Sequence, residues 1–171
     1  MITKFKRIVD GIDFLNDTIG RGIAWLTLLM VVVTCGVVIA RYLMGINSIA
    51  LQESVMYMHG CVFMLGIAFT LKEKAHVRVD VLYERYSDQV RALIDMLGTI
   101  LFLIPVNAFI FWISLEYVNF SWSLSESSAQ PGGLPAVYLL KTLIPVMAGL
   151  VTLQGIAEFL KAFFKFHKKD T

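Results

Sequence analysis

Charged residues are scarce in this sequence. Asp, Glu, Lys and Arg make up 16% of the 171 residues, whereas an ordinary soluble domain has about 25%. Hydrophobic residues reach 57%, and the mean hydropathy is +0.71. These values exclude an ordinary soluble domain and predict an integral membrane protein. The net charge is only +2, and the basic residues gather at the ends of apolar segments, so no nucleic-acid partner is expected.

Cysteine and the common catalytic motifs are also scarce. The two cysteines, Cys35 and Cys61, lie inside apolar segments, which predicts packing residues and excludes a disulfide framework. The sequence contains no GxxxxGK[ST], GxSxG, HExxH or CxxC pattern, so we expect no enzymatic activity, no metal and no cofactor. His59 is the one histidine inside a predicted span, which is too few for a bis-histidine haem anchor. It fits a packing residue better than a proton site, although both roles stay open.

Long apolar runs are what the sequence does have. At 1.5 Å per residue, about 20 apolar residues cross a hydrocarbon layer of about 30 Å as a helix. The sequence predicts four such spans, and we place them at about residues 22–40, 54–71, 93–115 and 142–160. The prediction is therefore an all-α membrane protein with four transmembrane helices in a single domain, residues 1–171. Pro105 and Asn107 predict a kink and a helix-to-helix hydrogen bond in the third span.

The segment before the first span, residues 2–19, has a helical pattern. Its apolar residues recur every three or four positions, and its charged residues occupy the other positions. This pattern predicts an amphipathic helix that lies flat at the membrane interface. A cytoplasmic helix docked on a partner subunit is the alternative.

The distribution of basic residues predicts the topology. Of the 15 Lys and Arg residues, all except Arg41 and Lys141 lie before the first span, between the second and third, or after the fourth. By the positive-inside rule, both termini are cytoplasmic. In the connection between the second and third spans, Asp80 is predicted to be a turn or N-cap residue that leads into an interfacial helix over 81–90.

Two charged residues, Arg41 and Glu53, are predicted at the same membrane face, where the first span ends and the second begins. Charges at an interface cost little. We expect a structural salt bridge or a headgroup contact, with a partner contact as the alternative.

Several of these residues form a recognisable set along nearly the whole chain. The set comprises Arg41, Glu53, Gly66, the segment His76-Val77-Arg78-Val79-Asp80-Val81-Leu82, and Gly133-Leu134-Pro135 ahead of Tyr138 and Pro145. With the four spans, it resembles the small Q subunit, or DctQ subunit, of tripartite ATP-independent periplasmic (TRAP) transporters. The segment with His76 and Asp80 is the most specific part of the resemblance.

The resemblance implies the partners and the location. In such transporters a large membrane subunit, M, holds the substrate and sodium sites, and a periplasmic subunit, P, captures an organic acid such as sialic acid or a C4-dicarboxylate. The small subunit would then be a scaffold and anchor for M in the bacterial inner membrane, in contact with membrane lipids. Residues 131–135 are expected to face the P subunit. His76 and Asp80 are expected to fix the turn between two spans or to contact M.

Two other functions remain open from the sequence. One is a membrane-anchor subunit of a respiratory complex, which would show a haem absorbance band. The other is a small, independent proton-coupled exporter, which would transport without partners. Copurification with a larger membrane subunit separates the scaffold from both.

Overall fold

A computed structural model describes residues 2–76, 83 and 85–167, with side chains from residue 5 onward. The elements are α1 (Ile2–Leu43), α2 (Ile49–Lys72), α4 (Asp88–Gly98), the π-helical turn η1 (Thr99–Leu103), α5 (Ile104–Ser123) and α6 (Val137–His167). The described part of the chain contains no strand. Because α4, η1 and α5 follow one another without a break, the structure has four helical segments long and apolar enough to cross a membrane. The prediction of an all-α membrane protein with four spanning helices is confirmed.

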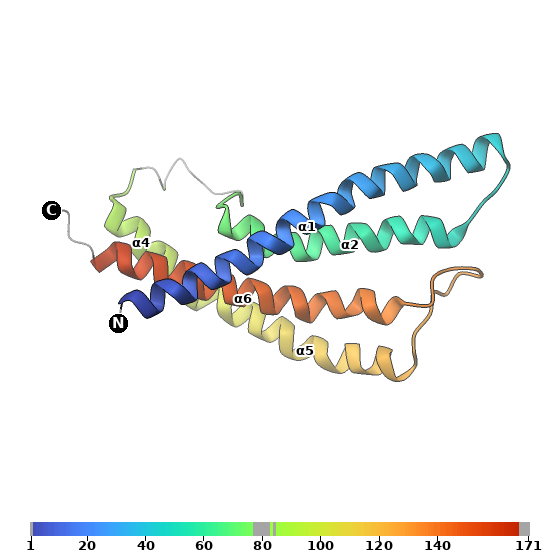
Figure 1. Cartoon of the computed structure of the whole chain (residues 1–171). Coiled ribbons are helices and arrows are strands. Elements are labelled where there is room, and N and C mark those ends of the chain that lie inside the picture. The colour runs from blue at the N-terminus through green and yellow to red at the C-terminus, as the bar shows by residue number, and fades with distance from the viewer. Residues whose placement is uncertain (1, 77–82, 84, 168–171) are drawn as a thin grey trace.

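The helices form two antiparallel hairpins, α1 with α2 and α5 with α6 (Figure 1). The first and last described residues, Ile2 and His167, lie at one end of the bundle, which we call the terminal end. The connections 44–48 and 124–136 lie at the other end, which we call the loop end. The helix α6 is central, since it packs against α1, α2, α4 and α5.

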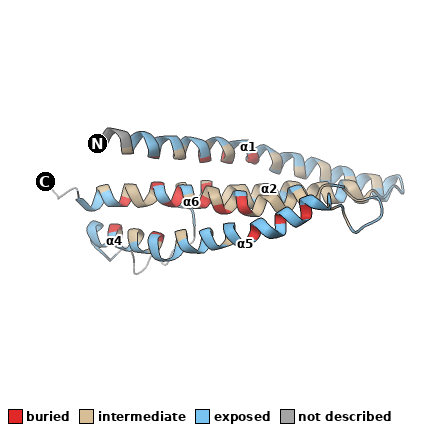
Figure 2. Ribbon diagram, turned by 90° about the horizontal axis from the view of Figure 1, so that it is seen from below, coloured by how far each residue is buried: buried red, intermediate tan, exposed pale blue. Residues whose placement is uncertain are grey.

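Small residues explain why α6 can be central. Its buried positions include Ala148, Gly155, Ala157 and Ala162 (Figure 2). In lipid no hydrophobic force draws helices together, so association depends on close packing, which small residues permit. At Gly155 an added Cβ would overlap the side chain of Leu103 in η1. The third helical segment therefore packs through Leu103 directly against the backbone of α6.

The ends of the four segments carry ionisable residues at similar spacing. The pairs are Arg21 and Arg41, Glu53 and Lys72, Asp95 and Glu116, and Lys141 and Lys161. Each pair is separated by about 20 residues, or about 30 Å of helix, which matches the thickness of the hydrocarbon layer. The helices extend beyond the predicted spans because the polar residues at these ends remain helical.

The first helix differs from its prediction. Residues 2–19 are helical, but they continue without interruption into the first span instead of forming a separate interfacial helix. This half of α1 lies against α6, where Val9 and Asn16 are buried. Its apolar residues Ile8 and Phe14 are instead 51% and 73% exposed. Polar contacts to α6, described below, hold the segment against the bundle and account for the difference.

The third segment contains a π-turn next to a proline. Pro105 lies in the first turn of α5 and has no N–H to donate, and the preceding turn, η1, adopts the wider π-helical form. Asn107 donates from Nδ2 to the carbonyl of Leu103 in its own helix, at 2.8 Å. The predicted hydrogen bond from Asn107 to another helix is not formed among the described residues of this chain.

The start of the third segment also differs from its prediction. The helix α4 begins at Asp88, and the Ser87 hydroxyl caps it by accepting from the N–H of Val90 at 3.4 Å. The prediction of an interfacial helix over 81–90 is therefore wrong for residues 88–90, because these residues already belong to the long third helical segment. Asp80 and residues 81, 82 and 84 lie outside the described residues.

Two predicted packing residues lie on the surface of the bundle. His59 is exposed on α2, and its ring stacks on Phe63 with an interplanar angle of 21°. Cys35 is exposed on α1, whereas Cys61 is half-buried. Internal packing is therefore wrong for His59 and Cys35 within this chain.

Candidate functional site

The loop end is organised by the carboxylate of Glu53 in the first turns of α2. It accepts a hydrogen bond from the backbone N–H of Leu134 at 2.6 Å and another from the hydroxyl of Ser128. The N–H of Ser128 donates to the carbonyl of Leu134 at 3.0 Å, which closes the same stretch of loop. One helix thus fixes a loop that follows it by about 80 residues.

Gly133 is required where the loop meets this carboxylate. A Cβ added at Gly133 would lie 2.5 Å from Ser128 Oγ and 2.7 Å from Glu53 Oε2, closer than real Cβ atoms approach other heavy atoms. Any larger residue would displace one of the two partners. We call Glu53, Ser128, Gly133 and Leu134 the Glu53 clamp.

A second acid, Glu126, supports the same loop from the other hairpin. Its Oε2 accepts from Ser121 Oγ at 2.5 Å and from Lys141 Nζ at 2.5 Å. Its backbone carbonyl accepts from the N–H of Val137, the first residue of α6. The hydrogen bond from Lys141, followed by that from Ser121, holds the pKa of Glu126 below its ordinary value. Lys141 also lies over the ring of Tyr117, 4.2 Å from its centroid.

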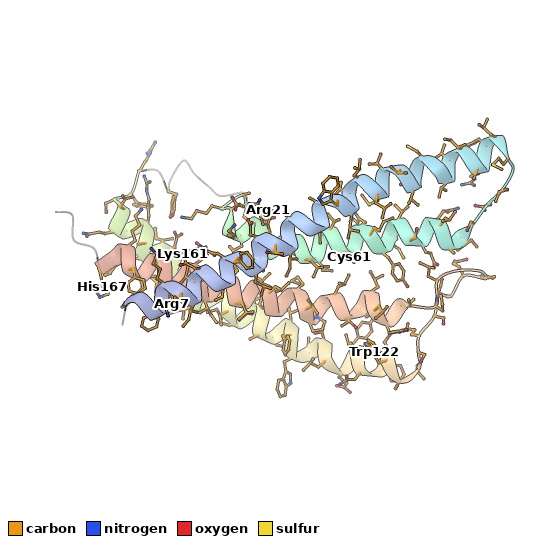
Figure 3. The ribbon with its side chains drawn as sticks, viewed as in Figure 1. Arg7, Arg21, Cys61, Trp122, Lys161 and His167 are labelled. Carbon is orange, nitrogen blue, oxygen red and sulfur yellow. The ribbon has the colours of Figure 1, made fainter. Side chains whose placement is uncertain are left out.

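Trp122 closes the α5–α6 hairpin beside Glu126. Its indole N–H donates to Thr142 Oγ1 at 2.9 Å, and its ring meets that of Tyr138 edge to face at 4.6 Å. Figure 3 shows Trp122 at the loop end of α5. The loop 124–136 is therefore held at its start, middle and end.

The terminal end has a separate polar network, which joins α1 to α6. Asn16 donates to Gln154 Oε1 at 2.8 Å, and Gln154 donates to Asp13 at 2.9 Å and to Glu158 at 3.1 Å. Lys161, labelled in Figure 3, forms ion pairs with both of these acids, at 2.9 and 2.7 Å. Asn16 and Gln154 are fully buried. We call these five residues the Gln154 network.

Asp17 extends the polar contacts of the terminal end to α2. Its carboxylate pairs with Lys72 at 2.7 Å and with Arg21 at 2.7 Å. Next to it, Gly20 lies against the ring of Phe69 with no room for a Cβ. The contact between α1 and α2 is thus closest where the charged residues end.

The structure separates the residues predicted to act together. Arg41 is exposed and forms no ion pair with any described residue, so its predicted salt bridge with Glu53 is wrong. Glu53 is satisfied instead by uncharged donors from the loop. Headgroup and partner contacts remain predictions for Arg41.

The other predicted site residues have different surroundings. Gly66 has room for a side chain, since an added Cβ would meet Ile23 Cδ1 at an ordinary 3.5 Å. Pro135 is exposed next to the Glu53 clamp. His76 is exposed in a bend at the limit of the described residues, and Asp80 lies beyond it. The roles of His76 and Asp80 remain predictions.

Several residues of these polar contacts have only a weak signal in the sequence. Glu126 is an isolated acid within a serine-rich loop, and Gln154 is a polar residue within an apolar span. Both patterns mark a buried polar contact, but neither identifies the partner. Among the described residues, no group of three or more His, Cys, Asp or Glu side chains could hold a metal ion.

Comparison with known proteins decides the family. The model of the DctQ component of tripartite ATP-independent periplasmic transporters matches residues 30–165. The chain belongs to this family. No curated protein and no solved structure matches it.

Membership in the DctQ family makes this chain a component of a TRAP transporter and a multi-pass membrane protein. DctQ is a transporter component and not an enzyme family. Tripartite transporters contain two further components, which implies a larger membrane partner and a periplasmic partner in general terms. The matched residues include both acids of the loop end and Gln154, but they leave out the first half of α1.

Proposed function

We propose that this DctQ protein is a scaffold and anchor for the large M subunit of a sodium-coupled TRAP transporter in the bacterial inner membrane. The family match over 30–165 carries the proposal. The geometry supports it, because the polar contacts gather at the two ends of the helices and the central helix packs through small residues. Such a bundle holds its own shape and leaves large apolar side chains on its surface for lipid or a partner.

The surface of α1 is well suited to this role. Trp25, Val32 and Leu43 follow one face of the helix and are 73%, 60% and 81% exposed. Lipid or the M subunit would cover these side chains. The substrate, an organic acid of the sialic acid or C4-dicarboxylate type, would bind to the other subunits.

Copurification and uptake test this proposal. The full chain, coexpressed with its M subunit, should purify as a stable complex. Proteoliposomes that contain both subunits, with the P subunit added outside, should accumulate the organic acid when sodium is supplied outside. Accumulation by the small chain alone would contradict the scaffold role, and a haem absorbance band would favour the respiratory alternative.

We further propose that the loop 124–136 contributes to docking of the P subunit. The loop is fixed by Glu53 and Glu126 while its serine-rich surface remains exposed. Insertion of two residues between Ala129 and Gln130, both exposed, should weaken P-subunit binding to the complex. An insertion between Gly45 and Ile46, in the other connection of the loop end, is the control. Equal binding by both variants would contradict docking at this loop.

A further inference from the structure

We infer that the terminal end of this protein binds an anionic phospholipid, with its headgroup in a basic cavity between α2, α4 and α6. The cavity has a volume of about 580 Å³, within the range of about 300–1,000 Å³ that is typical of small-ligand pockets. Among the residues that the structure describes, four basic ones line it, Lys74, Arg91, Lys161 and Lys165. This inference concerns lipid and does not depend on which partner subunit the chain braces.

The charges that line the cavity favour an anion. In the described part of the lining, two acids, Asp95 and Glu158, accompany the four basic residues. Glu158 is paired with Lys161, and Asp95 accepts a hydrogen bond from the Tyr83 hydroxyl at 2.8 Å. Lys165 lies 3.0 Å from Asp88, a carboxylate that Arg91 also approaches at 4.0 Å. Asp88 lies outside the cavity lining, so the described lining carries more basic than acidic side chains.

Lys74 is the clearest candidate for contact with the phosphate. It forms no ion pair with any residue that the structure describes, although it lies at the rim of the cavity. Its backbone has φ of 53° because Lys74 directly follows the C-cap of α2, where its N–H donates to the carbonyl of Leu71 at 3.1 Å and that of Ala75 donates to the carbonyl of Thr70 at 3.0 Å. Because the Lys74 ammonium has no ion pair with a described residue, it is available to an anionic group bound in the cavity.

The apolar part of the cavity lining suits an acyl chain. Leu71, Gly98, Leu103 and Ala162 line it, and Leu103 lies about 12 Å deeper along the helix than Asp95. In the described part of the chain, α2 packs against α1 and α6 without extensive contact with α4. A cavity lined by both basic and apolar side chains, placed at the end of the membrane spans, matches a phospholipid better than a free anion. Basic pockets between helices on the cytoplasmic side bind anionic lipid headgroups.

The test compares lipid retention by four forms of the full chain, alone or in its complex. The protein is purified in detergent, supplied with phosphatidylglycerol or phosphatidylcholine, and measured by native mass spectrometry. Lys74→Gln with Lys165→Gln should lower the apparent affinity for phosphatidylglycerol by about fivefold for each removed charge. Arg41→Gln, which removes an exposed charge at the loop end that pairs with no described residue, should leave the affinity unchanged.

Gly98→Leu separates the acyl chain from the headgroup. No atom lies within 4 Å of a Cβ added at Gly98, so leucine would occupy the cavity without a clash at the backbone and would favour the helix. It should reduce retention of phosphatidylglycerol while every basic residue remains. Equal affinity for the two lipids, equal losses in Arg41→Gln and the double variant, or displacement of the lipid by millimolar inorganic phosphate would each overturn the inference.

Discussion

Replacing Gly133 with alanine tests the Glu53 clamp directly. The new Cβ would lie 2.5 Å from Ser128 Oγ and 2.7 Å from Glu53 Oε2, so at least one hydrogen bond of the clamp must move. Overpacking of this kind typically costs about 1–3 kcal/mol. If the cost opens the loop locally, the amide of Leu134 should exchange its hydrogen roughly 5 to 140 times faster. Hydrogen exchange with mass spectrometry on the full chain in detergent measures this change.

A second variant identifies the atoms responsible. In a Ser128→Gly background both Ser128 atoms near the new Cβ are gone, so Gly133→Ala should accelerate exchange less than it does in the wild-type background. Gly36→Ala is the control, since no atom lies within 4 Å of a Cβ at that position. An unchanged Leu134 amide in Gly133→Ala, or an equal effect in both backgrounds, would show that the clamp does not hold the loop.

Three further changes test the rest of the bundle. The free energy of unfolding in mixed micelles should be about 1–3 kcal/mol lower for Gly20→Ala than for Gly22→Ala. Both variants gain the same helix propensity, but only the new Cβ at position 20 would clash with the ring of Phe69. Gln154→Leu should lower the unfolding free energy by about 1–3 kcal/mol, because it leaves buried polar partners unsatisfied; stability equal to the wild type would refute this. The pKa of Glu126 is lowered in the folded protein, so its charged form stabilises the fold at pH values above the ordinary pKa of 4.5. As the pH falls below 4.5 this stabilisation is lost, and the 124–136 loop should loosen. Hydrogen exchange followed from pH 7 downward checks this, and Glu126→Gln should flatten the response.

The helices could be predicted from the sequence because their signal is local. A run of about 20 apolar residues is enough to indicate a span, and the four runs were found. The positions of the helix ends could be predicted less accurately. Charged residues such as Asp13 and Lys161, which lie outside the apolar runs, remain helical because they pair with each other. The first half of α1 shows this best. Its amphipathic pattern was correct, but the partner of its polar side is on α6, almost 150 positions away.

The candidate site was predicted only in part, for a related reason. Glu53 and Gly133 were both identified through the family resemblance, but their contact joins α2 to a loop about 80 residues later, and no periodicity encodes that distance. His59 shows the second limit. A helix that is apolar on every side carries no pattern that distinguishes its inner face from its outer face, so the exposure of His59 could not be read from its neighbours.

The two hairpins are joined by polar contacts at opposite ends. At the terminal end Gln154 of α6 bonds to Asn16 and Asp13 of α1, and at the loop end Glu53 of α2 bonds to the loop that leads into α6. Between them, close approach through small residues such as Gly60 and Ala148 supplies the contact. Because apolar side chains gain little by leaving lipid for one another, the directional bonds at the ends fix how one hairpin sits on the other. Loss of either contact should therefore let the hairpins pivot about the other end, while each hairpin keeps its own packing.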